Sequence, residues 1–155
     1  MIDILDRVRN KELQSKIVTA EEAAAFFKEG MNVATSGFTA SAYPKAVPLA
    51  LAERMKKEPF TINLWTGAST GPELDEALAK VHGIKKRLPY QTDKDLRNVI
   101  NDGSVDYLDL HLSESAQLSR CGYLGKVDVA VVEACAITEE GNIIPTTSLG
   151  NAASY

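Results

Sequence analysis

Apolar residues near the N-terminus recur at the spacing of an amphipathic helix, so we expect a helix over Ile2–Leu13. A second helix should follow, because Thr19 and Glu22 form the pattern of a capping box. In such a box the hydroxyl caps the first turn and the carboxylate reaches back to the capping residue. This helix should run through Phe27 and end at Gly30, since glycine suits the position after a helix.

The rest of the chain alternates between strand and helix patterns. Val127–Ala134 is a nearly continuous apolar run, which is typical of a central strand in a parallel sheet. The repeated β-α-β order predicts an α/β fold with an open, mainly parallel sheet flanked by helices. We expect strands at 31–35, 60–65, 105–110 and 127–134, an extended piece near 84–90, and helices at 44–57, 72–81, 93–101 and 113–120.

Two loops of small residues follow the first two predicted strands. Thr35–Lys45 contains Gly37, which allows a tight turn, and Pro44, which suits the first turn of a helix. Thr66–Gly71 leads in the same way to a helix that opens at Pro72. Both loops should lie at the carboxyl edge of the sheet, where α/β folds bind ligands. The first loop taken alone favours a purely structural connection, whereas the two loops together support a structural connection and a ligand site equally.

Composition and charge narrow the class of protein. A chain of 155 residues with 45% hydrophobic and 25% charged residues fits one globular domain. Its net charge of −4 argues against a nucleic-acid partner or an anionic membrane surface. Cys121 and Cys135 lack the spacing of a zinc site, so we expect no metal and a reducing compartment. With no secretion signal or spanning segment recognised, we expect the cytoplasm.

A third loop of small residues lies near the C-terminus. Ile143–Asn151 is an extended piece followed by small and polar residues, after which the chain stops at Ala152–Tyr155. A loop of this kind normally leads into a helix. We therefore expect a truncated protein or an isolated domain.

The three loops and the stretches between them resemble the acetyl-CoA hydrolase/transferase family, within the class I CoA-transferases. The resemblance covers essentially the whole chain in order, and several of its motifs are six or more residues long. The residues that carry it are Ser36–Thr39, Tyr43–Pro48, Leu64–Gly71, Arg87–Thr92, Arg97, Ile100–Asn101, Gly103, Asp109–Ser113, Ala116–Gln117, Val127–Ala134, Ile137–Gly141 and Ile144–Asn151.

The resemblance implies a two-domain enzyme that moves CoA between short-chain acyl-CoA and carboxylates such as acetate, propionate and succinate. In this family a glutamate carboxylate attacks the acyl-CoA, and the resulting anhydride is converted to a glutamyl-CoA thioester. Coenzyme A is thus a substrate, and no metal is implied. In these enzymes the nucleophilic glutamate and the glycine-rich loops that bind the oxyanion and CoA belong to the C-terminal half. Residues 1–155 would therefore be an incomplete N-terminal domain, inactive alone, whose partners are the missing catalytic domain and, we expect, further copies of itself.

Seven residues are candidates for substrate binding through this resemblance alone. Ser69 matches a serine that faces the acyl or carboxylate end of the substrate, where its hydroxyl would donate to an oxygen. The other six match the loop that walls the acyl pocket and a loop near the domain junction: Gly37, Phe38 and Thr39, and Ser148, Gly150 and Asn151. No catalytic residue is expected in the chain.

Other candidates have simpler interpretations. Glu133 ends an apolar run and could be mistaken for the nucleophile, but a paired structural role is favoured. For Arg87 and Arg97, structural ion pairs are commoner than phosphate or carboxylate binding. His111 lies between leucines and is interpreted as a core or interface residue, whereas His82 should be exposed at a helix end.

Two function classes remain open. The first is the N-terminal domain of a CoA-transferase or of the related acetyl-CoA hydrolase, which the sequence does not separate. The alternative is a stand-alone α/β binding or assembly module without catalysis, in which the loops would form an interaction surface. A dimer that buries the three loops would favour the second class.

Overall fold

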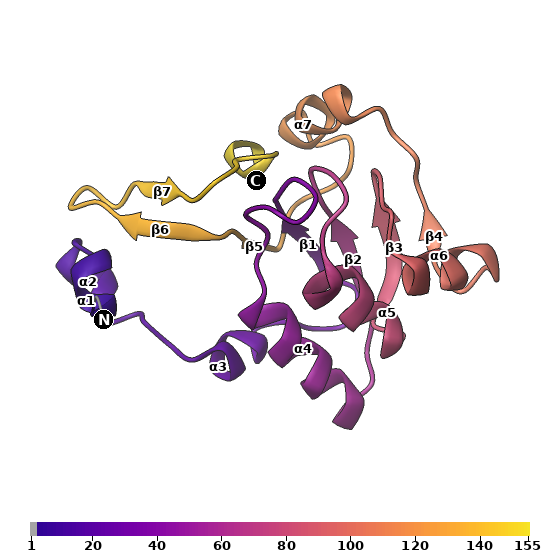
Figure 1. Ribbon diagram of the computed structural model, residues 1–155, viewed down its shortest axis with the longest axis horizontal. Coiled ribbons are helices and arrows are strands. Elements are labelled where there is room, and N and C mark those ends of the chain that lie inside the picture. Colours follow the sequence, from indigo (N-terminus) through magenta and orange to yellow (C-terminus); the bar gives the residue numbers. More distant parts are fainter. Residues whose placement is uncertain (1–2) are drawn as a thin grey trace.

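A parallel five-stranded sheet forms the centre of the part of the chain that the computed structural model describes, residues 3–155 (Figure 1). Neighbouring strands follow the order β4-β3-β2-β1-β5, and each pair is parallel. This confirms the open, mainly parallel α/β fold. The strands are β1 (Asn32–Thr35), β2 (Ile62–Trp65), β3 (Ile84–Leu88), β4 (Asp106–Tyr107) and β5 (Val129–Val131).

Side-chain hydrogen bonds cap the first turn of two helices around the sheet. The predicted capping box is present, because Thr19 and Glu22 each bind the other's backbone N–H at the start of α3 (Ala20–Ala24). Asp93 caps α6 (Lys94–Asn101) by accepting from Leu96 N–H at 2.8 Å. The other helices around the sheet are α4 (Ala46–Lys57), the π-helical turn η1 (Pro72–Glu76), α5 (Ala77–Lys80) and α7 (Leu112–Arg120).

One helix start differs from the sequence prediction. Helix α4 begins at Ala46 rather than at Pro44, because Lys45 has a φ of −119° and only caps the helix. Lys45 instead directs its ammonium group to the carbonyl of Tyr43 and the carboxylate of Glu133. The loop after β1 is therefore longer than expected.

The core lies on both faces of the sheet, because successive side chains of a strand point to opposite faces. In β2, Ile62 and Leu64 pack into the larger cluster, which includes Leu51 and Leu78 from α4 and α5. Trp65 packs on the other face with Ala34 and Leu88, and Leu110, Leu124, Val127 and Tyr155 lie against these three. Both faces are thus covered over β1, β2 and β3, as parallel sheets require.

The N-terminal region is not the single helix that the spacing predicts. Two short helices, α1 (Ile4–Arg7) and α2 (Lys11–Gln14), are separated at Val8, and Ile2 lies outside the described residues. The break has a long-range cause: Val8 forms a β-bridge with Ile137, and Arg9 N–H donates to the Ile137 carbonyl at 2.9 Å.

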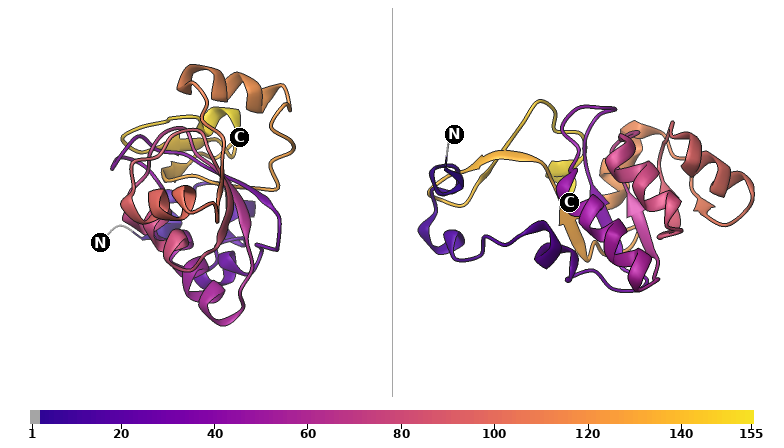
Figure 2. Two further views of the ribbon diagram at one scale, coloured as in Figure 1. Left: turned by 90° about the vertical axis from the view of Figure 1, so that its right-hand side faces the viewer. Right: turned by 60° about the horizontal axis from the view of Figure 1, so that its bottom comes forward.

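The partner of this N-terminal region is an antiparallel hairpin of β6 (Ala134–Ile137) and β7 (Ile143–Pro145). We call residues 4–14 and 134–145 together the arm. The arm projects away from the five-stranded sheet, as the right-hand view of Figure 2 shows. After the arm, a short 3-10 turn, η2 (Ala152–Ser154), closes the described chain close to α7.

The apolar run Val127–Ala134 predicts a central strand, and this prediction is wrong for the residues described. Only Val129–Val131 forms a strand, β5, and it lies at one edge of the sheet beside β1. The chain leaves the sheet after Val131 and enters the hairpin at Ala134. The strand predicted at 105–110 is shorter too, because only Asp106 and Tyr107 pair with β3. Within residues 3–155, no helix has both the length and the apolar character to cross a membrane.

Candidate functional site

The three loops of small residues meet at the carboxyl ends of β1 and β2, as the sequence predicts for the first two. Ser36, which directly follows β1, joins the first loop to the third. Its hydroxyl donates to the Leu149 carbonyl at 2.9 Å and accepts from Asn151 N–H at 2.7 Å. Ser148 adds a second link, since its hydroxyl lies 3.2 Å from the Ser41 carbonyl. The loop 146–151 is therefore fixed against the loop 36–45.

Glycine makes this close approach possible. Gly150 has a φ of +50°, and a Cβ there would lie 2.3 Å from Ser36 Oγ and 2.8 Å from the Gly37 carbonyl oxygen. A Cβ on Gly67, in the second loop, would lie 2.9 Å from Asn151 N. Both positions exclude a side chain unless the neighbouring loop moves. The three loops thus form one continuous wall of backbone and small side chains.

The tip of the first loop stands out from this wall. Phe38 and Ser41 exchange two backbone hydrogen bonds, of 2.9 and 3.0 Å, which close a tight turn. Thr39 and Ala42 both have left-handed backbone, with φ of 55° and 54°, a conformation that is unfavourable for a β-branched residue such as threonine. The Phe38 side chain is 56% exposed. An aromatic ring held out by a constrained turn is available to contact a ligand.

The base of the same loop is held by two acid–base contacts. The buried Tyr43 hydroxyl donates to Glu73 in η1, and burial, followed by this hydrogen bond, raises the pKa of Tyr43 to about 12. Glu133, just beyond β5, accepts from Lys45 Nζ at 2.8 Å and from Thr146 Oγ1 at 2.7 Å. These hydrogen bonds lower the pKa of the Glu133 carboxyl, the one from Lys45 most. Both carboxylate oxygens of Glu133 are thereby engaged, which agrees with the paired structural role.

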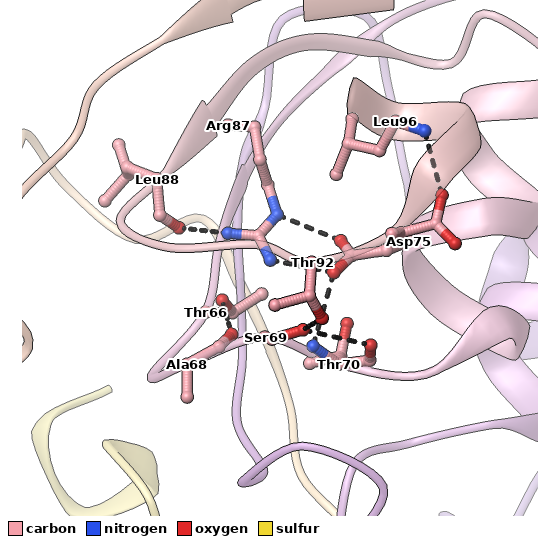
Figure 3. A network of polar contacts seen from close by, with 10 residues as sticks. Thr66, Ala68, Ser69, Thr70, Asp75, Arg87, Leu88, Thr92 and Leu96 are labelled. Atoms are coloured by element: carbon pink, nitrogen blue, oxygen red, sulfur yellow. Dashed lines mark hydrogen bonds and ion pairs between the residues drawn. The ribbon is translucent and has the colours of Figure 1, made fainter. Parts of the chain in front are cut away.

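Ser69 lies in the second loop and is 2% exposed. Its hydroxyl contacts the Thr92 hydroxyl at 2.5 Å, so the two form a pair (Figure 3). Ser69 follows β2 and Thr92 follows the adjacent strand β3, which explains why they meet. Sequence reasoning missed Thr92 as a neighbour of the candidate serine. Thr92 could have been found as a small polar residue in the loop that follows β3, the parallel strand beside β2.

A buried ion pair holds the loop that carries Ser69. Asp75 and Arg87 are both 0% exposed, and the carboxylate receives Nε and Nη2 of the guanidinium at 2.9 Å each. Arg87 also donates to the Leu88 carbonyl, and Asp75 accepts from Thr70 N–H at 3.3 Å (Figure 3). Arg87 is thus a structural residue, as favoured from the sequence. Arg97 donates to the Thr92 carbonyl at 3.0 Å and so also supports this corner.

A cavity of about 170 Å³ lies beside the first and third loops. Of the predicted substrate-binding residues, Ser148 lines the cavity, whereas Ser69 and Asn151 do not. The Asn151 side-chain amide instead donates to Ser115 Oγ at 2.6 Å. The lining consists of Ser36, Ala42, Val132, Glu133, Ile143, Pro145, Ser148, Leu149, Ala152 and Ala153.

None of the histidines and cysteines lines the cavity. His111 is exposed, with Nδ1 2.7 Å from Ser113 Oγ, so it is not a core residue, and the alternative of an interface residue stays a prediction. The leucines beside it, Leu110 and Leu112, are themselves only half-buried or exposed. His82 is exposed, as predicted. Cys121 and Cys135 are free and exposed, and residues 3–155 contain no cluster of three or more side chains suited to a metal ion.

Sequence comparison links this chain to a family of CoA enzymes. Residues 1–155 match the acetyl-CoA hydrolase/transferase N-terminal domain. The chain is 51% identical to the succinyl-CoA:acetate CoA-transferase of Clostridium kluyveri over 96% of its length, and 42% identical to the propanoyl-CoA:succinate CoA transferase of Escherichia coli over 93%. An acetyl-CoA hydrolase of Schizosaccharomyces pombe is 37% identical over 93% of the chain. The chain spans 28%, 30% and 30% of these relatives.

Solved structures with low sequence identity share the fold. A variant of the decarboxylase AibA/AibB matches with a TM-score of 0.66 at 18% identity, covering 88% of this chain and 70% of that one. The acyl-CoA transferase YdiF of Escherichia coli O157:H7 matches with a TM-score of 0.62 at 14% identity, covering 70% of this chain and 22% of YdiF.

Proposed function

Because this chain belongs to the acetyl-CoA hydrolase/transferase family, we propose that it forms the N-terminal part of an enzyme that moves CoA between short-chain acyl-CoA and carboxylates. Acetate, propionate and succinate are the carboxylates we propose, since the names of the two transferase relatives include them. Hydrolysis of acetyl-CoA is the related activity and would require water to reach the same site.

The observation that carries this proposal is the joining of three separate loops into one wall. Loops 36–45, 66–71 and 146–151 come from distant parts of the sequence, yet Ser36 binds the third loop directly. Gly150 and Gly67 allow the backbones to touch at positions where a side chain would not fit. A wall of this kind at the carboxyl edge of a parallel sheet is the usual place for a ligand in an α/β fold.

Within this wall we assign the substrate-contacting roles as follows. The Ser69 hydroxyl would donate to the acyl carbonyl or carboxylate oxygen, and Thr92, already in contact with it, would hold that hydroxyl in place. Gly37, Phe38 and Thr39 would wall the acyl group, with the exposed Phe38 ring as the apolar contact. Ser148, Gly150 and Asn151 would lie at the junction with the rest of the enzyme.

The chemical step would use a nucleophile outside this chain. A glutamate carboxylate of the C-terminal part would attack the acyl-CoA, forming an acyl anhydride and releasing the CoA thiolate. The thiolate would then attack the glutamyl carbonyl, forming the glutamyl-CoA thioester and releasing the carboxylate, so that one difficult acyl exchange is split into easier ones. The contribution of this chain is positioning and hydrogen bonding to the developing oxyanion. The chain alone should therefore show no turnover.

The test is CoA exchange in a reconstituted enzyme. The chain is mixed with the part of the Clostridium kluyveri transferase that lies beyond the matched region, and transfer from succinyl-CoA to acetate is measured beside release of free CoA. We expect exchange in the mixture and none with either part alone. A Ser69→Ala variant should lower kcat/KM by about 10²-fold, in the range of a lost oxyanion donor, whereas the exposed Ser104→Ala should not.

Two results would contradict the proposal. Turnover by the 155-residue chain alone, free of host enzyme, would show that it carries its own nucleophile. Absence of exchange in every mixture, with both parts folded and associated, would favour the stand-alone binding or assembly module.

A further inference from the structure

The ion pair of Asp75 and Arg87 differs from the others in the molecule by its burial. Both side chains are 0% exposed, whereas every other ion pair among residues 3–155 keeps at least 30% of each side chain exposed. Taking two charges out of water can cost as much as their attraction returns, so apolar side chains of similar volume would stabilise the sheet as well. The burial of this pair therefore points to a role beyond stability.

The Arg87 guanidinium connects the two ends of the second small-residue loop. Its Nη1 donates to the Leu88 carbonyl at 2.8 Å, and the same carbonyl accepts the Thr66 N–H, at the start of that loop, at 2.9 Å. Its Nε and Nη2 bind the Asp75 carboxylate, which accepts the Thr70 N–H near the end of the loop (Figure 3). One side chain thus links both anchors of the segment that carries the candidate serine.

A second arginine holds the other member of the hydroxyl pair. The Ser69 hydroxyl contacts the Thr92 hydroxyl, and Thr92 lies in the loop that directly follows β3, the strand of Arg87. Arg97, in α6, donates from Nη2 to the Thr92 carbonyl at 3.0 Å. The loop of Ser69 is therefore fixed from within the sheet, and the backbone of Thr92 is fixed from the protein surface, where Arg97 is exposed.

The contacts of Arg87 require the geometry of arginine. A guanidinium is planar and carries five N–H donors in a fixed fork, so it can bind a carboxylate through two of them and a carbonyl through a third. At Arg87 these acceptors are Asp75 and the Leu88 carbonyl. A lysine ammonium is a compact charge on a flexible stem, and it would not hold both acceptors in the same arrangement.

We propose that Arg87 and Arg97 are positioning residues, which hold the Ser69–Thr92 pair in the orientation in which the Ser69 hydroxyl donates to a substrate oxygen. The inference rests on the proposed function, because it takes Ser69 as the group that contacts the substrate. A displacement of about 1 Å is enough to weaken such a donor strongly in the transition state. The two arginines thus act on the rate through Ser69 and not through a contact of their own with the substrate.

The test compares arginine variants in two backgrounds of the reconstituted enzyme, the parent chain and Ser69→Ala. Transfer of CoA from succinyl-CoA to acetate is measured in each. In the parent, Arg87→Lys should lower kcat/KM by about tenfold and Arg97→Gln by about fivefold, with the loss in kcat rather than in KM. In the Ser69→Ala background each substitution should lower kcat/KM by less than about twofold, because the hydroxyl that the arginines position is absent.

Arg54→Lys is the matched control for loss of an arginine fork. Arg54 is half-buried and donates to the carbonyls of Ala24 and Phe27, which lie outside both loops. This variant should leave kcat/KM within about twofold of the parent value. Because Arg97 is exposed, Arg97→Gln should fold even where Arg87→Lys does not, and it then decides the test alone.

Two results would overturn this inference while the proposed function stands. The first is a folded arginine variant whose kcat/KM equals that of the parent. The second is a loss of the same size in the parent and in the Ser69→Ala background, because the arginines would then act by a route other than Ser69. Absence of CoA exchange in the parent mixture would instead overturn the proposed function, and this inference with it, so the two failures are distinguishable.

Discussion

The central sheet and the arm use apolar residues in opposite ways. Around β1–β3, large apolar side chains such as Leu51, Leu64 and Trp65 are 2% exposed or less. In the arm, by contrast, Ile4, Ile143 and Ile144 are 56%, 54% and 42% exposed. The central sheet thus buries its own apolar side chains, whereas the arm leaves an exposed apolar surface that another part of the protein can cover.

The candidate site lies where these two regions meet. The loops after β1 and β2 belong to the sheet, whereas the loop 146–151 directly follows the arm. Ser36 joins them through hydrogen bonds to Leu149 and Asn151. We infer that the sheet supplies a rigid half of the wall, and that the third loop is the part most sensitive to change.

The largest effect is expected from the buried ion pair in the sheet region. Asp75→Ala leaves the Arg87 guanidinium buried without its carboxylate, so the free energy of unfolding should fall by about 3–5 kcal/mol. Urea unfolding measures this. The control is Glu53→Ala, which removes a largely exposed ion pair with Lys56 and should cost less than about 1 kcal/mol. Equal losses in the two variants would contradict the view that the sheet region depends on its buried contacts.

An intermediate effect is expected at the border between the regions. Gly150→Ala should cost about 1–3 kcal/mol, because the new Cβ meets Ser36 and the Gly37 backbone. Gly122→Ala is the matched control: Gly122 also has positive φ, at +75°, but nothing lies within 4 Å of an added Cβ. Hydrogen exchange should show faster exchange in 146–151 for Gly150→Ala alone. Faster exchange throughout β1 and β2 as well would show that the two regions are not separable.

The smallest effect is expected from the Tyr43 hydroxyl, which ties the first loop to η1. Tyr43→Phe should lower the free energy of unfolding by about 1 kcal/mol near neutral pH, since Glu73 can be rehydrated. The pKa of Tyr43 is raised to about 12. Between pH 10 and 12 the unfolded chain therefore loses this proton before the folded chain does, and the parent protein should lose stability relative to the variant.

The pH dependence provides the decisive comparison for Tyr43. The pKa of Tyr155 is also raised to about 12, by burial, but Tyr155 is present in both proteins and its contribution cancels in the difference. A difference in stability between parent and Tyr43→Phe that stays constant from pH 9 to 12 would contradict the assignment.

Local patterns in the sequence predict the features that depend on neighbouring residues. The Thr19–Glu22 capping box and the placement of both small-residue loops at one sheet edge follow from such patterns. Contacts between residues far apart in the sequence could not be predicted from such local patterns. The break at Val8 comes from pairing with Ile137, which no nearby residue signals. The contact of Ser69 with Thr92 likewise depends on β2 and β3 being neighbours.

The difference between local patterns and long-range contacts also explains why the strand predicted at Val127–Ala134 was misplaced and why the partner of Arg87 was not predicted. An apolar run predicts that Val127–Ala134 is buried, but it does not say which other strand covers it. The sequence indicates that Arg87 could form an ion pair, but Asp75 becomes its partner only when η1 packs beside β3. The substrate-contacting roles of Ser69, Phe38 and the other site residues stay predictions.

The most direct test of the central claim is the location of covalently bound CoA. The claim is that this chain supplies one wall of a CoA-transferase site whose glutamate nucleophile lies in the C-terminal part. The chain and the C-terminal part of the Clostridium kluyveri transferase are incubated with acetyl-CoA, separately and together, and the intact mass of each is measured. We predict that only in the mixture does the C-terminal part gain the mass of CoA less one water, as a glutamyl-CoA thioester forms and acetate is released, and that this chain stays unmodified. Covalent CoA on this chain, at Glu133 or elsewhere, would contradict the account.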